Sequence, residues 1–176
     1  MPHQDPDELF DVVDEADRVV GQATRAVVHR DGLRHRSSHV FVLNSSGELF
    51  LQRRALTKDE DPGAWDSSAA GHLDAGESYL AGALRELREE LGLGVPPSSL
   101  TEVARLPATA EGGWEFRRLF VVTTDAPLTP DPTEVLEGRF LPLDELERRL
   151  ADGSLHVTRA FAAFYDLYRA WAARRG

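Results

Sequence analysis

The chain contains no cysteine among its 176 residues, which excludes disulfide bonds, thiolate metal ligands and cysteine nucleophiles. Long hydrophobic runs are also missing, because no segment approaches the roughly 18 apolar residues of a membrane span. The first ten residues, MPHQDPDELF, lack the apolar stretch of a secretory signal. We therefore expect a cytoplasmic protein with no membrane partner.

Positive charge is scarce as well, with 20 Lys and Arg residues against 30 Asp and Glu residues and a net charge of −10. Non-specific nucleic-acid binding requires a basic surface, so we expect no nucleic-acid partner. An acidic chain can still bind phosphate groups where cations or local arginines mediate the contact. The length and the 41% hydrophobic content fit one globular domain over residues 1–176.

The pattern of apolar residues predicts both strands and helices, an α+β fold with a mixed sheet and helices on its faces. We expect strands within 10–21, a hairpin over 39–54, a loop over 57–71, and further strands in 115–125 and 135–141. We expect helices over 24–32, about 78 to 91, within 141–153 and about 158 to 174. The last helix carries aromatic residues at core spacing, which predicts packing: Phe161, Phe164, Tyr168 and Trp171.

An acidic cluster interrupts the otherwise ordinary helix of residues 78 to 91. Glu86, Glu89 and Glu90 stand at positions i, i+3 and i+4, so they share one face and repel one another. A solvated charged face is the usual interpretation, but no matched set of cations accompanies these carboxylates. The glycine-containing loop GHLDAGE precedes the helix, and Mg²⁺ prefers carboxylate oxygens of this kind. The pattern favours a magnesium site over a solvated face.

Residues 71–93, GHLDAGESYLAGALRELREELGL, resemble the Nudix box, Gly-x5-Glu-x7-Arg-Glu-U-x-Glu-Glu-x-Gly-U with U an apolar residue. The residues that fill its specified positions are Gly71, Glu77, Arg85, Glu86, Leu87, Glu89, Glu90, Gly92 and Leu93. The resemblance implies a Nudix-like α/β/α sandwich with a mixed β-sheet between helices. It covers about residues 10 to 145.

The resemblance also implies an activity, the hydrolysis of a diphosphate linkage by water attack on phosphorus with Mg²⁺ or Mn²⁺. The substrate would be a small molecule, a nucleoside di- or triphosphate or a nucleotide conjugate, and the protein a monomer or homodimer. The implied metal ligands are Glu86, Glu89, Glu90 and the Gly71 carbonyl, with Glu77 near the metals. Arg85 would orient the carboxylates, and either Glu86 or Glu89 would help to deprotonate the water.

The segment before the box resembles the branch of this family that also contains type I isopentenyl-diphosphate isomerases. The binding histidines and the downstream glutamate of that enzyme have counterparts in His35, His72 and Glu115, with His29 a weaker one. The isomerase has a catalytic cysteine where this chain has Ala70. An isomerase is therefore a weaker alternative. A non-catalytic nucleotide-binding module is another, although no glutamate of the box is lost.

Phosphate-binding candidates lie at the end of the strand that closes the hairpin, Arg53 and Arg54, and in the loop that follows, Lys58. Strand alternation sends the two arginines to opposite faces, so only one enters the cleft unless a bulge intervenes. Both faces carry large apolar residues, and our preference is Arg53. Trp65 and Phe116 are candidates for stacking on a nucleobase, with core packing at least as favoured.

Overall fold

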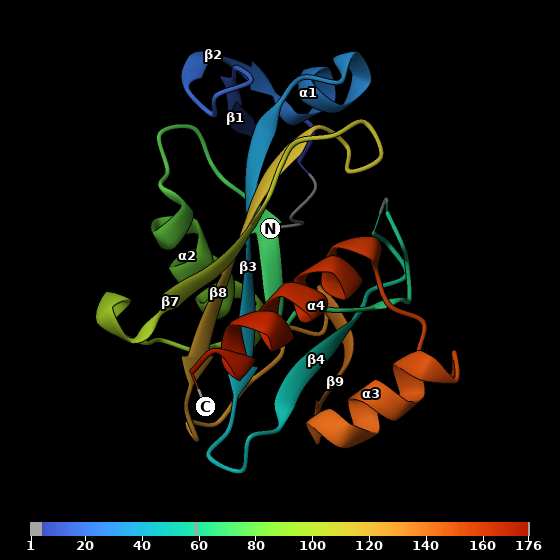
Figure 1. Cartoon of the computed structure of the whole chain (residues 1–176). Helices are drawn as coiled ribbons and strands as arrows, with labels where there is room; N and C mark the ends of the chain where they lie inside the picture. Colours follow the sequence, from blue (N-terminus) through green and yellow to red (C-terminus); the bar gives the residue numbers. More distant parts are fainter. Residues whose placement is uncertain (1–4, 59, 176) are drawn as a thin grey trace.

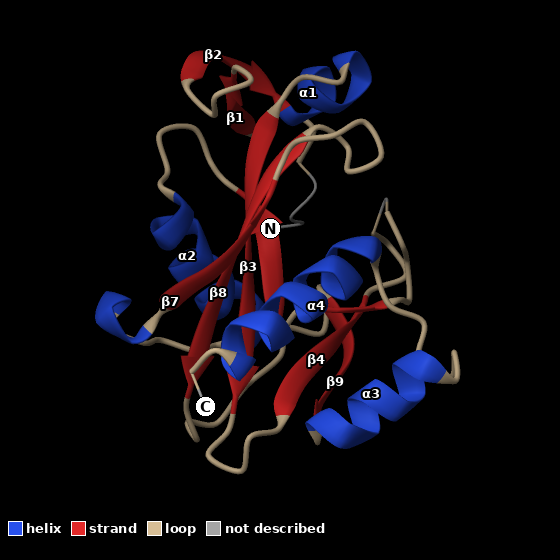
Figure 2. Cartoon of the chain, viewed as in Figure 1, coloured by secondary structure: helices blue, strands red, loops and turns tan. Residues whose placement is uncertain are grey.

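The computed structural model describes residues 5–58 and 60–175; the predicted domain also includes residues 1–4, 59 and 176, which lie outside the described residues. A mixed seven-stranded sheet forms the middle layer, with helix α2 on one face and helices α3 and α4 on the other (Figures 1 and 2). The predicted α/β/α sandwich is confirmed. In the described part of the chain, no helix combines the length and apolarity that crossing a membrane requires.

The central sheet has the order β5-β4-β3-β8-β7, with β6 paired to β3 and β9 paired to β4. Its strands are β3 (His35–Leu43), β4 (Leu49–Arg54), β5 (Trp65–Asp66), β6 (Ala69–His72), β7 (Thr101–Leu106), β8 (Glu115–Thr123) and β9 (Val135–Leu141). Strands β3 and β8 run parallel, whereas the other pairs are antiparallel. A separate two-stranded sheet is made by β1 (Leu9–Val13) and β2 (Val19–Thr24).

The helices lie within a residue or two of the ranges predicted from the sequence. They are α1 (Arg25–Asp31), α2 (Tyr79–Leu91), α3 (Leu143–Ala151) and α4 (Arg159–Ala173), with a 3₁₀ turn η1 (Pro97–Ser99). The Ser78 hydroxyl accepts a hydrogen bond from Ala81 N at the start of α2. Gly92 ends the same helix with φ of 62°, a left-handed conformation that glycine adopts without strain.

Alternation along β3 builds two cores, one on each face of the sheet. Val40 and Val42 pack with the leucines of α2, and Phe41 packs with the aromatic residues of α4. Those aromatics, Phe161, Phe164 and Tyr168, are buried, with Trp171 packed at the margin, so the predicted packing role is confirmed.

The prediction of an uninterrupted loop over 57–71 is wrong, because this stretch contains β5 and the first residues of β6. Strand β7 was not predicted either. Strand β6 has the sequence AAGH, which carries no apolar alternation, and it forms by pairing with Ser37 to Val40 of β3. Pairing partners that are distant in the sequence therefore made strands that local pattern does not indicate.

Candidate active site

A cavity of about 570 Å³ lies where β3, β5, β6 and the Nudix-like helix α2 meet the start of α4. Among the described residues, the charged and polar members of its wall are Glu8, Arg25, Ser37, His39, Arg54, Lys58, Glu60, Asp61, Asp66, His72, Glu86, Glu90, Glu111, Glu115, Arg117, Thr158 and Arg159. Carboxylates and cations thus share one polar cavity, which suits a phosphorylated ligand bound together with a metal ion.

Glu86 lies in this wall, and its position depends on the glycine at 71. Only 2% of Glu86 is exposed, and its Oε1 atom accepts a hydrogen bond of 2.6 Å from Arg85 Nη1. A Cβ atom added to Gly71 would lie 2.0 Å from that oxygen, so no larger residue fits beside the carboxylate in this position. The close approach explains why these two residue types occur together.

Glu90, one helical turn further along α2, is equally buried and also lines the cavity. Its Oε2 atom accepts hydrogen bonds from the backbone N–H of Ala70 at 3.0 Å and from Gln52 Nε2 at 2.6 Å. Gln52 was not among the sequence-predicted site residues. The only signal for it was its place two residues before Arg54, on the same face of β4.

Arg85 connects two further glutamates of the Nudix box, Glu77 and Glu89. Its guanidinium donates to both carboxylate oxygens of Glu77 at 3.0 Å, to Glu89 Oε2 at 3.1 Å and to the carbonyl of His72 at 2.8 Å. In the described structure, Glu77, Arg85 and Glu89 are not part of the cavity wall, and the Glu89 side chain is 40% exposed. Arg85 therefore orients the carboxylates of the box from a position outside the cavity wall.

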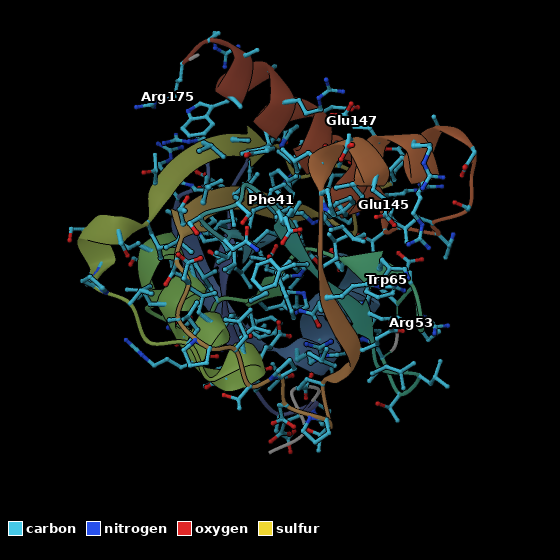
Figure 3. All side chains as sticks on the ribbon, turned by 90° about the horizontal axis from the view of Figure 1, so that it is seen from below. Phe41, Arg53, Trp65, Glu145, Glu147 and Arg175 are labelled. Carbon is cyan, nitrogen blue, oxygen red and sulfur yellow. The ribbon has the colours of Figure 1, made fainter. Side chains whose placement is uncertain are left out.

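The two adjacent arginines of β4 point in different directions. Arg54 lines the cavity and pairs with Asp66 Oδ2 at 3.0 Å. Arg53 donates to the carbonyl of Gly63, its side chain is 42% exposed, and it lies at the periphery beside Trp65 (Figure 3). Our preference for Arg53 as the cleft-facing arginine is therefore wrong. Alternation correctly grouped Arg54 with Gln52, but only the packing of Gln52 against α2 shows which face meets the cavity.

A register irregularity between β4 and β9 does fall between these two arginines, yet it does not bring Arg53 into the cavity wall.

Lys58 is in the cavity wall and forms an ion pair with Glu134, a buried carboxylate that sequence reasoning missed. Trp65 and Phe116 are not among the wall residues; they pack in the cores on the two faces of the sheet, so the packing alternative holds for both.

His35, His72 and Glu115 are brought together because β3 and β8 align His35 with Glu115; His72 and Glu115 line the cavity, whereas the buried His35 is not among the wall residues. His72 Nε2 lies 3.0 Å from Glu115 Oε1, and His35 Nε2 lies 3.7 Å from the same oxygen. Arg25 Nη1 lies 3.0 Å from His72 Nδ1. A guanidinium can only donate, so Nδ1 accepts this bond, and Nε2 carries the proton that is donated to Glu115.

Ring nitrogens of His29, His35 and His72 lie within 4.8 Å of one another, so these residues could hold a metal ion. Such an ion would have to displace one of the two contacts of His72, either that of Nδ1 with Arg25 or that of Nε2 with Glu115. Burial raises the pKa of Glu115, but His72, His35 and Arg117 outweigh it and hold that pKa well below the usual range. Burial lowers the pKa of His72 to about 4, so the ring is neutral at pH 7.

Comparison with known proteins decides the family. A family model of the NUDIX domain matches residues 33–161. The chain belongs to the Nudix hydrolase family. It is 38% identical over 172 residues to the Nudix hydrolase SCO1686 of Streptomyces coelicolor, covering 97% of this chain and 93% of that protein. It is 36% identical over 164 residues to an isopentenyl-diphosphate Delta-isomerase of Streptomyces griseus, covering 89% of this chain and 79% of that protein.

Among solved structures, DR0079 of Deinococcus radiodurans is similar, with a TM-score of 0.77 and 30% sequence identity. The similarity covers 92% of this chain and 98% of that one. The Nudix resemblance that the box indicated is therefore confirmed over both the sequence and the fold. The isomerase relatives agree with the branch that the segment before the box resembles.

The carboxylates of this Nudix box fit a divalent ion by their type and by their electrostatics. Burial raises the pKa of Glu86 to about 7, although Arg85 lowers it. Burial and repulsion from Glu86 raise the pKa of Glu90 to about 8. Two buried carboxylates that resist ionisation next to each other are stabilised as anions by a hard cation such as Mg²⁺.

These two raised pKa values predict how the stability of the metal-free protein depends on pH. The folded state holds protons on Glu86 and Glu90 that the unfolded state, with carboxyl pKa values near 4.5, has already released. The free energy of unfolding contributed by these groups therefore falls as pH rises from about 4.5 to about 8. Below pH 6.5 the buried neutral His39 and His72, with pKa values of about 4, act in the opposite direction.

We therefore expect the melting temperature, measured with a chelator present, to change little from pH 4.5 to 6.5, because the two histidines offset the two carboxylates, and to fall from pH 6.5 to 8. Glu90→Gln should flatten the second part, because the amide has no proton to release. An equal decline in that variant would contradict the assignment to Glu90.

Proposed function

We propose that this Nudix protein hydrolyses a diphosphate linkage in a nucleoside di- or triphosphate or in a nucleotide conjugate, using Mg²⁺ or Mn²⁺ and water attack on phosphorus. One observation supports this most directly. Two buried carboxylates of the box, Glu86 and Glu90, share a cavity wall with two cations suited to phosphate, Arg54 and Lys58. When bound, the ion would neutralise charge on the phosphate oxygens and would make the attacking water more acidic.

The side chains divide the remaining work. Glu86 and Glu90, with the Gly71 carbonyl, would hold the ion, and Glu89 and Glu77 would support it through Arg85. Either Glu86 or Glu89 would take the proton of the attacking water, and the closer contact of Glu86 with the cavity favours Glu86.

Cations would hold the phosphate oxygens. Arg54 and Lys58 bind them near the box, and Arg25 and Arg117 extend the cationic lining toward His72 and Glu115. Arg25 and Arg117 were not predicted from the sequence.

An isomerase is a second candidate, favoured by the grouping of His35, His72 and Glu115 and by the similarity to named isomerases. Ala70 stands where that enzyme has its catalytic cysteine, so a central proton-transfer group is missing.

One experiment separates these functions. The purified protein is incubated with Mg²⁺ and a panel of nucleoside diphosphates, nucleoside triphosphates, nucleotide conjugates and isopentenyl diphosphate, and products are read by mass and released phosphate. We expect hydrolysis of at least one nucleotide, abolished by a chelator and restored by Mg²⁺. Undiminished hydrolysis after metal removal, isomerisation of isopentenyl diphosphate, or binding without turnover would each overturn the proposal.

Single alanine substitutions of the two β4 arginines should have unequal effects. We expect Arg54→Ala to lower kcat/KM about tenfold or more, equivalent to losing roughly 1.5–3 kcal/mol from a charged hydrogen bond. Arg53→Ala, the matched control outside the cavity, should stay within about twofold of the wild type. Steady-state kinetics on folded protein checks both. Equal losses would mean that the orientation of this strand differs during turnover.

A further inference from the structure

Gln52 is a buried polar side chain on β4 whose shorter hydrogen bond reaches the acidic helix α2. It is 3% exposed, and its Nε2 atom is 2.6 Å from Glu90 Oε2 and 3.3 Å from the carbonyl of Ser68. The backbone N–H of Ala70 donates to the same Glu90 oxygen at 3.0 Å. Two donors from different strands, β4 and β6, thus converge on one carboxylate oxygen.

The chemistry of the donor matters as much as its position. An amide N–H group and a backbone N–H group orient a carboxylate without neutralising it. A lysine or arginine at position 52 would place a full positive charge beside Glu90, where it would compete with a metal ion. Because both donors act on Oε2, Oε1 is the oxygen left to face an ion.

We propose that Gln52 is a positioning residue for metal binding, which fixes the rotamer of Glu90 so that Oε1 meets the ion. This role rests on the proposed function, in which Glu90 is a metal ligand. Donors that orient a ligand in this way typically change metal affinity or activity by about 10- to 100-fold when they are removed. No direct contact of Gln52 with the ion or the substrate is part of the role.

A purely structural role for Gln52 makes a different prediction. If the amide only satisfies a buried carboxylate, its loss destabilises the fold but leaves the metal affinity of the folded protein unchanged. Metal affinity without substrate is therefore the deciding quantity, and the melting temperature is recorded beside it.

The experiment measures Mn²⁺ binding by calorimetry, without substrate, for the wild type, Gln52→Leu and Gln52→Asn. Leucine removes the donor at similar volume, and asparagine keeps an amide but withdraws it by one methylene. Gln22→Leu is the matched control. Gln22 lies on the exposed strand β2, and its Nε2 atom also donates to a carboxylate oxygen, Asp11 Oδ1 on β1, at 3.1 Å. We expect Kd for Mn²⁺ to rise about tenfold or more in Gln52→Leu and to stay unchanged in Gln22→Leu.

Enzyme kinetics give a second readout. In Gln52→Leu, we expect a large rise in the Mg²⁺ concentration that gives half-maximal activity. The fall in kcat at saturating Mg²⁺ should be the smaller of the two fold-changes. A folded Gln52→Leu protein that binds Mn²⁺ as tightly as the wild type would overturn the positioning role. If Gln52→Leu does not fold, Gln52→Asn decides, and wild-type affinity in that variant would overturn the role. Failure of the wild type itself to bind Mn²⁺ would instead overturn the metal site of the proposed function.

Discussion

Replacing Glu86 with glutamine should lower kcat by on the order of 10²-fold or more, as loss of one preorganised electrostatic group does in other active sites. The amide keeps the size of the side chain, and its oxygen can still accept the hydrogen bond from Arg85. Only the negative charge is removed, so the loss would report the charge at the metal position. The variant should fold normally.

The same substitution should raise the stability of the metal-free protein at pH 8. Glu86 and Glu90 are both buried, and repulsion from Glu86 contributes to the raised pKa of Glu90. Removing one charge relieves this repulsion and the cost of burial, which is the usual trade between activity and stability in a functional site. A structural glutamate would show the opposite change in stability.

Steady-state kinetics with saturating Mg²⁺ and thermal melting with a chelator measure the two effects. Glu145→Gln is a suitable control, because Glu145 lies on α3 and its partner is Arg149, outside the cavity wall. If kcat of the Glu86→Gln enzyme stays within about threefold of the wild type, Glu86 is not a metal ligand.

Gly71→Ala should be almost as damaging, through steric displacement of the same carboxylate. The added Cβ would lie 2.0 Å from Glu86 Oε1 and 2.3 Å from its Cδ. Either the carboxylate moves or strand β6 does, so we expect kcat to fall on the order of 10²-fold and stability to fall by about 1–3 kcal/mol, as in other overpacked sites. The φ angle of Gly71 is not in the left-handed region, so backbone strain does not contribute.

Gly21→Ala is the control for this substitution, since Gly21 also lies in a strand and a Cβ there meets no atom within 4 Å. A double-mutant cycle supplies the decisive comparison. In a Glu86→Ala background the clash is absent, so Gly71→Ala should then cost little stability. An equal loss in both backgrounds would show that alanine disturbs β6 itself and not the carboxylate.

The sequence alone determined those features that depend on neighbouring residues. Helix α2 was predicted from the sequence because a helix is built from bonds between residues a turn apart, and in the structure Ser78 and Gly92 cap its two ends. The same spacing placed Glu86 and Glu90 on one face. The Nudix box, being a contiguous motif, indicated the family and the fold without any tertiary information.

Only the tertiary structure decided how distant segments complete the site. Strand β6 exists because AAGH pairs with β3, and this pairing brings Gly71 against Glu86. The parallel alignment of β3 with β8 joins His35 to Glu115. The packing of β4 on α2 decides two further features of the site. It places Arg54 in the cavity wall, and it brings Gln52 to Glu90. Local alternation fixes which side chains share a face of a strand, but the choice of the face that meets the site is made by long-range packing.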